Sequence, residues 1–273
     1  MKKIKIAIIG LGTAGRARLS AVQSSSHFEL AGVVSRRSEF STLSLEEVLQ
    51  DPSIEAVAIS TENALHGSQV WQVLQSQKHV LCDYPLCFSE TEARQLFTCA
   101  QDQKKVLHVE HIALLMQSHQ ILKTQIPHLG SFIEGEFRFT AGWNPSLQDL
   151  SRQGPFPFLC ESRLVQLSDL LGAFEVESSS VIQNEQQAEL RLQLGFASGG
   201  RIFFQETRAV HLKRERYFRA RFEKGEIGWP GVVEPRGLFE KDLEHFYKRV
   251  RLGSKNYYDE EQMIKILGML EKL

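Results

Sequence analysis

The chain has 273 residues, 42% of them hydrophobic, which is enough for a large core and for more than one average domain. Its 32 Lys and Arg residues are offset by 33 Asp and Glu residues, and a net charge of -1 provides no global field for nucleic acid or an anionic membrane, so neither is expected as a partner. No apolar stretch approaches the ~20 residues that span a bilayer, and Met1-Lys2-Lys3 runs into a short strand rather than a signal-peptide core, so we expect a cytoplasmic protein.

Residues 1–116 alternate short apolar runs with amphipathic segments, a pattern that predicts parallel strands joined by crossover helices. Ser44 and Glu47 have capping-box spacing, as do Ser89 and Glu92, so a helix should follow each serine, and another is expected over 64–77. The expected strands are mostly too apolar to leave one face in water; they are 4–10, 28–35, 56–60, 80–83 and 106–108. We therefore predict a doubly wound α/β domain of the Rossmann type.

The pattern changes in residues 117–238. Leu190, Leu192, Leu194 and Phe196 alternate with polar residues, which is typical of a sheet with one buried face. Extended segments are expected at 132–140, 189–196, 202–207 and 212–222, with a helix over 162–171. This predicts a second, α+β domain with a mostly antiparallel sheet. The last amphipathic segments, 239–249 and 260–273, should be C-terminal helices that pack on the first domain.

A glycine-rich turn, Gly10-Leu11-Gly12-Thr13-Ala14-Gly15, directly follows the first strand and opens a helix. In a dinucleotide site the first glycine permits the tight turn, the second lets the backbone approach a pyrophosphate, and the third allows close packing of helix on strand. The helix N-terminus, with Thr13 and Ala14, then offers free N–H groups to the phosphates. A glycine turn can also serve chain geometry alone, but the strand before it and the helix after it favour a cofactor site.

The end of the second strand carries Ser35-Arg36-Arg37, where NAD-binding folds place an acidic residue. A guanidinium can pair with a 2'-phosphate that a carboxylate would repel, so NADPH is favoured over NADH. The alternative is two solvated surface arginines. Thr61-Glu62-Asn63 follows the third strand at the same edge of the sheet and could contact the ribose or nicotinamide.

Several stretches in chain order carry a family resemblance: Gly10 to Gly15, Ser35 to Arg37, Lys78 to Leu81, Asp83 to Pro85, Lys105 to His111, Phe139 to Gly142, Ser162 to Leu164 and Leu212 to Tyr217. On these the chain resembles the biliverdin reductases, a divergent branch of the glucose-fructose oxidoreductase-like (Gfo/Idh/MocA) family of two-domain dehydrogenases. The Asn144-Pro145 turn, the Phe156-Pro157 segment and residues 236–239 look like cyanobacterial members. The family usually has Glu where this chain has Asp83, and the region after Gly172 looks short.

The resemblance implies reduction of the central methine bridge of biliverdin IXα to bilirubin, with hydride from NADPH and a proton delivered to a pyrrole nitrogen. Tyr84 stands where sugar oxidoreductases of this layout carry a catalytic lysine, and it could stack on the pigment or pack beside Pro85. Arg163 corresponds to an arginine that family members place over the substrate, and we expect it to be the principal catalytic side chain; alone, it could be a surface arginine. Asp83 is expected at the cofactor.

Further residues could hold the substrate. Arg214 and Arg216 share one face of an extended segment and could bind the two propionates of a bilin, although a solvated sheet edge is an equal alternative. Trp143 could line an aromatic wall, but aromatic residues are more often core. Glu110 and His111 are expected near the substrate, and His108, Glu110 and His111 lack metal-ligand spacing, so no metal is expected.

Two alternatives to this reaction remain open on the sequence. One is a related reductase that acts on another conjugated or cyclic substrate, and the other is a non-catalytic NADPH- or bilin-binding sensor. The oligomeric state, either monomer or weak homo-oligomer, is also left open. The four cysteines, Cys82, Cys87, Cys99 and Cys160, have no paired spacing, which predicts reduced and mostly buried thiols.

Overall fold

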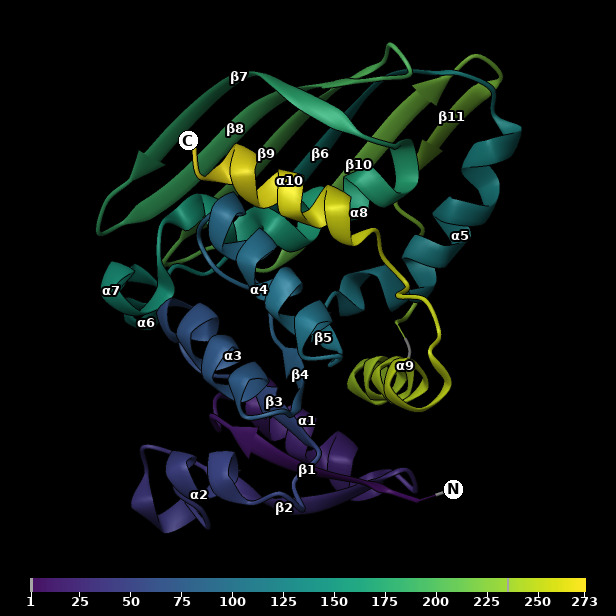
Figure 1. Ribbon diagram of the computed structural model, residues 1–273. Coiled ribbons are helices and arrows are strands. Elements are labelled where there is room, and N and C mark those ends of the chain that lie inside the picture. Colours follow the sequence, from purple (N-terminus) through teal and green to yellow (C-terminus); the bar gives the residue numbers. More distant parts are fainter. Residues whose placement is uncertain (1, 235) are drawn as a thin grey trace. The chain divides into compact units, whose positions relative to one another are not determined.

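In the computed structural model, which describes residues 2–234 and 236–273, the chain divides into two compact units (Figure 1). The first unit comprises Met1–Ile112 and Arg236–Tyr257, and the second comprises Ala113–Pro235 and Tyr258–Leu273. The first boundary therefore falls four residues before the expected one at 116. Each unit contains one sheet of its own, as the change of pattern along the sequence predicts.

The sheet of the first unit is parallel throughout and has the strand order β2-β1-β3-β4-β5. Its strands are β1 (Ile4–Ile9), β2 (Phe28–Val34), β3 (Ala56–Ile59), β4 (His79–Cys82) and β5 (Leu107–Val109). The chain winds outward from β1 to β2 and then in the opposite direction through β3. In open sheets of this kind, ligands bind at the carboxyl ends of the strands next to such a reversal.

Helices cover both faces of this sheet, as its apolar strands require. They are α1 (Thr13–Ser24), α2 (Leu45–Gln50), α3 (His66–Gln75), α4 (Glu90–Asp102) and α9 (Leu238–Leu252). The capping box of Ser44 and Glu47 forms at the start of α2, with both reciprocal bonds present. Ser89 is the N-cap of α4, but its side chain makes no capping bond, so the second expected capping box is absent.

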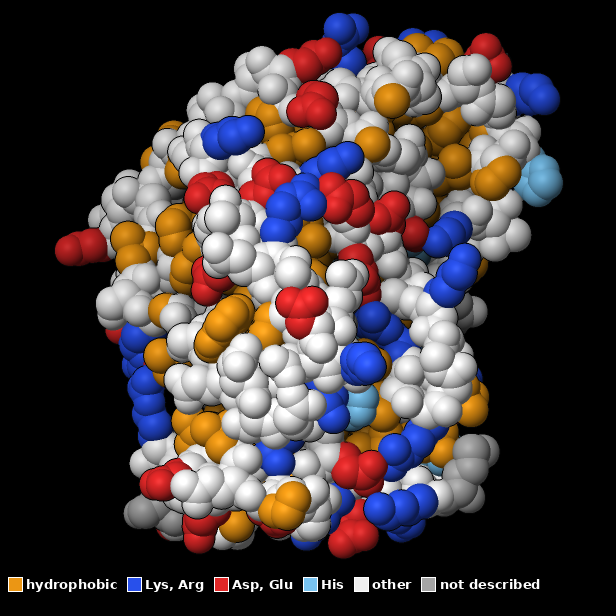
Figure 2. Space-filling model, in the orientation of Figure 1, with side chains coloured by type: hydrophobic (Ala, Val, Ile, Leu, Met, Phe, Trp, Pro, Cys, Tyr) orange, Lys and Arg blue, Asp and Glu red, His pale blue; other side chains and the backbone are white. Residues whose placement is uncertain are grey.

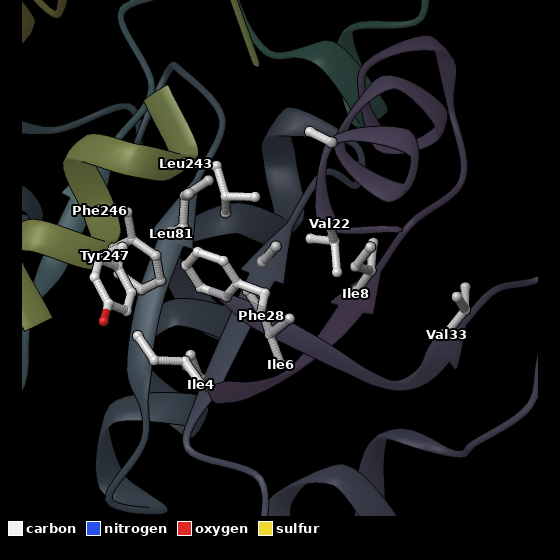
Figure 3. Close-up of a cluster of buried hydrophobic side chains, with 13 residues drawn as sticks. Ile4, Ile6, Ile8, Val22, Phe28, Val33, Leu81, Leu243, Phe246 and Tyr247 are labelled. Atoms are coloured by element: carbon white, nitrogen blue, oxygen red, sulfur yellow. The ribbon is translucent and has the colours of Figure 1, made fainter. Parts of the chain in front are cut away.

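Helix α9 closes the core of the first unit although it lies far from the other elements in sequence. Its Leu243 and Phe246 lie in one buried cluster with Ile6, Phe28 and Leu81 of the sheet (Figure 3). Each such side chain contributes roughly 1.5–3 kcal/mol when fully buried. Helix α9 is therefore part of the first unit.

The second unit is built on a six-stranded sheet in which only β6 and β9 run parallel. The strand order is β11-β10-β6-β9-β8-β7. The strands are β6 (Phe132–Ala141), β7 (Phe174–Gln183), β8 (Gln187–Phe196), β9 (Arg201–Ala209), β10 (Glu215–Phe222) and β11 (Gly225–Gly228). The buried positions of β8 alternate with less buried ones as its Leu pattern predicts.

The second unit also contains α5 (Gln117–Gln125), α6 (Pro145–Gln148), α7 (Leu150–Gln153), α8 (Glu161–Leu171) and α10 (Glu260–Leu270). Short 3-10 helices complete the two units at Ser38–Phe40, Asn63–Leu65, Ile112–Leu115, Ile126–His128 and Phe156–Cys160. Helix α10 packs against α8 in this unit, which differs from the expectation that both C-terminal helices join the first domain. The reason is that α8 is buried on nearly every side, so its surface needs a further covering helix.

The face drawn in Figure 2 carries Lys and Arg side chains interspersed with Asp and Glu side chains. This agrees with the near-neutral total charge and gives that face no extended patch of a single sign. Among the described residues, no helix combines the length and apolar character that crossing a bilayer demands.

Candidate functional site

The glycines of the turn after β1 are of two kinds: two are needed for close packing, and one faces open space. A Cβ on Gly10, whose φ is +93°, would lie 2.3 Å from the carbonyl oxygen of Ser60, and a Cβ on Gly15 would lie 2.1 Å from that of Gly10. A Cβ on Gly12 would meet nothing within 4 Å. Gly10 and Gly15 therefore bring β1, β3 and α1 together, whereas Gly12 leaves room beside the helix.

That room lies at the N-terminus of α1. Gly12 is the N-cap residue and has no side chain to cap the helix, so the N–H groups of the first turn, which begins at Thr13 and Ala14, are available to a ligand. A pyrophosphate fits such a place because it accepts hydrogen bonds and meets the positive end of the helix dipole. The residues present thus fit a dinucleotide cofactor.

Arg36 and Arg37, which follow β2, differ in whether their guanidinium groups are paired. The Arg36 guanidinium forms a two-pronged ion pair with Glu62, whose Oε1 lies 2.7 Å from Arg36 Nη1. Arg37 is exposed, and its guanidinium has no partner within the described ranges 2–234 and 236–273. The Ser35 hydroxyl accepts a hydrogen bond from the Arg37 N–H at 3.2 Å. One arginine is therefore neutralised by an internal carboxylate and the other is open to an anion.

Thr61 and Asn63 follow β3 at the same edge of the sheet, as the sequence predicts. The Thr61 hydroxyl donates to Gln69 Oε1 at 2.7 Å, and Asn63 begins a 3-10 helix. The buried side chain of His66 links this segment to the next strand, because its Nδ1 lies 2.7 Å from the carbonyl oxygen of Pro85 and its Nε2 lies 3.3 Å from that of Thr61. His66 was not among the predicted site residues.

The loop after β4 presents Tyr84 beside the end of β5. The peptide bond between Tyr84 and Pro85 is cis. The Tyr84 ring stacks on the His111 ring, with centroids 5.9 Å apart and planes 18° apart. Burial, with a further contribution from His108, lowers the pKa of His111 to about 3, so this imidazole is neutral at pH 7. A tyrosine stacked on a neutral imidazole therefore forms part of this edge of the sheet.

Two carboxyl groups, Asp83 and Glu110, are buried at the carboxyl ends of β4 and β5. They follow the paired residues Cys82 and Val109 and therefore project to the same face of the sheet. Burial raises the pKa of Asp83, and burial together with the Asp83 charge raises the pKa of Glu110 to about 8. Glu110 Oε1 accepts a hydrogen bond from the Ile112 N–H at 2.6 Å. This edge therefore retains a carboxyl proton at neutral pH.

Arg18 and Asp242 extend this cluster into the helices of the first unit. Arg18 Nη1 lies 2.7 Å from Asp242 Oδ2, and Arg18 Nη2 lies 3.5 Å from Asp83 Oδ1. Asp242 Oδ1 is also 2.8 Å from His108 Nε2 and accepts a hydrogen bond from the Tyr257 hydroxyl at 2.8 Å. Burial alone would raise the pKa of Asp242, but Arg18 and His108 hold it well below its ordinary value.

Arg18, Asp242 and Tyr257 were not among the predicted site residues. The first two carry a signal, because each charged side chain falls on the apolar stripe of its helix. Arg18 lies three and four residues before the buried Ala21 and Val22, and Asp242 lies four residues before the buried Phe246. A charge in such a position requires a buried partner. Nothing in the sequence near Tyr257 indicates its role.

The Arg163 guanidinium lies buried in the second unit and is held by several groups. Its Nε lies 2.8 Å from Glu206 Oε2, its Nη2 lies 3.0 Å from Glu206 Oε1, and Nη2 also donates to the Leu159 carbonyl. Its Cζ lies 4.7 Å from the centroid of the Phe139 ring. Arg163 is thus a buried, fixed and charge-compensated group rather than a surface arginine.

Trp143 is part of the core of the second unit. Its ring is 1% exposed, its Nε1 donates to the Asn184 carbonyl at 3.0 Å, and Phe156 meets it edge-on at 5.8 Å. Because the indole N–H is already bonded and the residue is buried, the placement favours the core alternative over an aromatic wall for the substrate.

Arg214 and Arg216 occupy different surroundings. Strand β10 begins at Glu215, so Arg214 precedes the strand, and its guanidinium lies 5.6 Å from the centroid of Phe139. The Arg216 guanidinium lies 4.3 Å from the Trp229 centroid, and its Nη1 lies 3.5 Å from the sulfur of Met116. Of these two arginines, Arg214 is the one that shares the Phe139 ring with Arg163.

Within the described part of the chain, no group of three His, Cys, Asp or Glu side chains could hold a metal ion. His108, which was considered as a metal ligand on the sequence, is hydrogen-bonded through its Nε2 to Asp242.

The chain is similar to known oxidoreductases. Residues 4–111 match the oxidoreductase family with an NAD-binding Rossmann fold. Over 260 residues the chain is 30% identical to biliverdin reductase A of Mus musculus, covering 91% of this chain and 86% of that protein. The chain belongs to the biliverdin reductase family. The human biliverdin reductase A is 29% identical over 288 residues, covering 100% of this chain and 95% of that protein.

Solved structures show how widely the fold of this biliverdin reductase family member is shared. The biliverdin reductase of Synechocystis sp. PCC 6803, solved with biliverdin and NADP+, has a TM-score of 0.86 at 23% identity and covers 98% of this chain and 97% of that one. A levoglucosan dehydrogenase solved with NADH and L-sorbose has a TM-score of 0.83 at 15% identity, with coverages of 99% and 96%. The family is therefore one of NAD(P)H-dependent oxidoreductases, and the fold alone does not choose the substrate.

Proposed function

We propose that this chain reduces the central methine bridge of biliverdin IXα and yields bilirubin, with NADPH as the hydride source. The observation that carries the proposal is the similarity to mammalian biliverdin reductase A along nearly the whole chain. Tyr84 supports it, because the edge of β4 carries a tyrosine stacked on a neutral His111 and no lysine for alcohol chemistry. A flat conjugated substrate needs positioning more than it needs a strong base.

The cofactor preference rests on the end of β2. The exposed Arg37 has no acidic partner among residues 2–234 and 236–273, and Ser35 lies beside it, so a 2'-phosphate would gain a cation there. Arg36 adds a second cation if the phosphate displaces Glu62. The NADP+ bound by the Synechocystis protein agrees with this preference.

The bound dinucleotide would supply hydride, and the protein side chains would supply binding and charge. The Gly10 to Gly15 turn, Thr61, Glu62, Asn63 and Asp83 are the proposed cofactor contacts of the first unit. Arg163 is proposed to stabilise negative charge on the pigment as the hydride arrives, since a guanidinium keeps its proton and acts by its field. Its ion pair with Glu206 fixes its orientation for that role.

The substrate contacts proposed in the first unit are Tyr84, Pro85, Glu110 and His111. The proton on the buried Glu110 is a reserve for the pyrrole nitrogen, because a carboxyl whose pKa is about 8 is still protonated at pH 7. In the second unit, Arg163, Arg214 and Arg216 remain proposed contacts for the polar edges of the pigment.

We propose the cytoplasm as the place of the reaction. The four cysteines are buried and form no disulfide among the described residues, as the sequence predicts, and reduced thiols suit a reducing compartment.

The test of the reaction is isotope transfer. The purified chain would be given biliverdin IXα and NADPH carrying deuterium at C4 of the nicotinamide, in each of its two labelled forms. One form should yield bilirubin one mass unit heavier, with the deuterium at the central bridge. Unlabelled bilirubin from both forms would contradict hydride transfer to that carbon.

A further inference from the structure

Three buried carboxyl groups of the first unit share one guanidinium group. Asp83 and Glu110 follow β4 and β5, Asp242 lies on α9, and all three interact with the charge of Arg18 on α1. Asp242 Oδ2 lies 2.7 Å from Arg18 Nη1, whereas Asp83 Oδ1 lies 3.5 Å from Arg18 Nη2. Within residues 2–234 and 236–273, Asp83 Oδ1 has no hydrogen-bond partner. Arg18 therefore balances Asp242 and leaves Asp83 and Glu110 short of positive charge.

The other ionisable groups around this pair do not restore the balance. His108 and His111 are neutral, because burial lowers the pKa of each. The Tyr257 hydroxyl is neutral as well, because burial raises its pKa well above the ordinary value. His66 faces Asp83 and lies between two backbone carbonyl oxygens, so it can add one positive charge at most. Among the groups that the structure describes here, at least one carboxyl therefore has no cation to balance its charge.

Glu110 answers this imbalance by holding a proton. Its side chain is buried, and burial together with the Asp83 charge raises the pKa of Glu110 to about 8. Its Oε1 accepts a hydrogen bond from the Ile112 N–H at 2.6 Å, which fixes the carboxyl in place. Because the proton is retained for lack of positive charge, a cation brought to this edge of the sheet would release it.

The cofactor brings such a cation in one of its two forms. The arginines after β2 and the N-terminus of α1 are the proposed sites of the adenosine phosphate and the pyrophosphate. The nicotinamide half then belongs on the other side of the strand-order reversal, toward the ends of β4 and β5. The nicotinamide ring is neutral in NADPH and carries one positive charge in NADP+.

We propose that the Asp83–Glu110 pair distinguishes the oxidised cofactor from the reduced one by charge: the pair keeps one proton when NADPH is bound and releases it when NADP+ is bound. An opposite charge within about 4–6 Å lowers a carboxyl pKa by about 1–3 units. The inference rests on the proposed function in one respect, because the released proton would be the one that passes from the Glu110 carboxyl to the pyrrole nitrogen. The link between proton and cofactor needs no pigment.

The experiment therefore counts the protons released on cofactor binding in the absence of pigment. NADP+ and NADPH are each titrated into the protein at about pH 7.5 by calorimetry, in Pipes and in Tris, which differ in ionisation enthalpy. The difference in heat between the buffers gives the number of protons released. Both cofactors carry the same 2'-phosphate, so subtracting the NADPH value from the NADP+ value cancels proton changes at that group.

The wild type should release about 0.5–0.8 proton more with NADP+ than with NADPH, since a carboxyl pKa of about 8 is lowered by about 1–3 units. Glu110→Gln keeps an acceptor for the Ile112 N–H but has no proton to release, so its difference should be zero. Asp83→Asn removes the charge that helps Glu110 to hold its proton, and it should at least halve the difference. The control Glu46→Gln, exposed on α2, should behave as the wild type.

The affinities give a second reading of the same link. The ionised pair favours NADP+, so the ratio of NADP+ to NADPH affinity should rise several-fold from about pH 7 to pH 8.5 and then level off, once Glu110 is ionised before the cofactor binds. In Glu110→Gln the ratio should stay constant over this range.

Equal proton release with both cofactors in the wild type would overturn the inference, and so would a difference that Glu110→Gln retains. If Glu110→Gln does not fold, an unchanged difference in Asp83→Asn overturns it instead. The proposed reaction is judged separately. A proton difference without reduction of biliverdin would remove the reaction and leave this inference standing, whereas reduction without a proton difference would remove the inference alone.

Discussion

Arg18 and Asp242 form a fully buried ion pair, 2.7 Å between Nη1 and Oδ2, that joins helices α1 and α9 across 224 residues of sequence. Helix α1 begins at the glycine turn, Gly10 to Gly15, which is the proposed cofactor turn. Helix α9 closes the core of the first unit. The pair thus connects the cofactor turn to a segment near the end of the chain.

Replacing Asp242 should be costly. Asp242→Asn leaves the Arg18 charge buried beside a neutral group and weakens the bond to His108, so the free energy of unfolding should fall by about 3–5 kcal/mol. Urea denaturation measures the change. The control is Glu244→Gln on the same helix, whose half-exposed side chain pairs with His27 and Lys248 and should change stability by less than ~1 kcal/mol. Equal stability of both variants would contradict the role of Asp242.

The pH dependence of stability should carry the signature of Glu110. Its pKa in the folded chain is raised to about 8 from an ordinary 4.5, so the folded state holds a proton that the unfolded state releases. The stabilisation is fully present below pH 4.5 and is lost as pH rises toward 8, at up to ~1.4 kcal/mol per pH unit.

Glu110→Gln should therefore flatten the decline in unfolding free energy between pH 6 and pH 8. Urea denaturation at three pH values measures the slope, and the exposed Glu46→Gln on α2 is the control, which should decline like the wild type. A wild-type slope unchanged by Glu110→Gln would show that this carboxyl is ionised in the folded protein.

The glycines of the cofactor turn should fail in different ways. Gly12→Ala places its Cβ in open space, so the melting temperature should hold while NADPH binding weakens at least about tenfold, because the methyl group meets the pyrophosphate. Gly10→Ala forces a Cβ against the Ser60 backbone at a positive φ and should lower the melting temperature by several degrees. NADPH fluorescence and thermal melts separate the two. Unimpaired binding by Gly12→Ala would contradict a cofactor at this turn.

Glu62 should limit the preference for NADPH. In Glu62→Gln the neighbouring Arg36 loses its internal carboxylate, so the ratio of NADPH to NADH affinity should rise several-fold. Arg37→Gln should lower the same ratio about tenfold, since it removes the unpaired cation. Titrations of both cofactors at one salt concentration give the ratios. An opposite change in Glu62→Gln would mean that Glu62 orients Arg36 for the phosphate.

Removing Arg163 should abolish most turnover with little effect on NADPH affinity. We expect Arg163→Gln to lose at least about a hundredfold in turnover of biliverdin. Since this change also leaves Glu206 buried with Arg208 alone, the double variant Arg163→Gln, Glu206→Gln is the control for stability. It should recover part of the lost melting temperature and none of the activity. Activity restored together with stability would reduce Arg163 to a structural residue.

The sequence predicted local patterns well and long-range pairings poorly. The five strands of the first sheet follow from apolar runs, and the Ser44 capping box forms as its spacing predicts. Strand β7 was missed because its middle, Ser178 to Ser180, is exposed small polar residues with no alternation. The ion pair of Arg18 with Asp242 could not be predicted from either segment alone, because a charged residue in a helix does not indicate which distant residue pairs with it.

The candidate site shows the same division. The glycine turn, the arginines after β2 and Tyr84 were predicted from their place next to strand ends, and Glu110 from the family resemblance; the structure puts all of them at the carboxyl ends of the strands. Glu206 was missed as the partner of Arg163 because the two residues are 43 positions apart and neither segment indicates the other.

The central claim is most directly tested by an absorbance time course of the purified chain with biliverdin IXα and either NADPH or NADH. The account predicts that the green pigment is converted to yellow bilirubin, faster with NADPH than with NADH. Binding of pigment and cofactor with no change of colour would contradict it and indicate a sensor or carrier, and failure to bind biliverdin would contradict it in favour of another conjugated substrate.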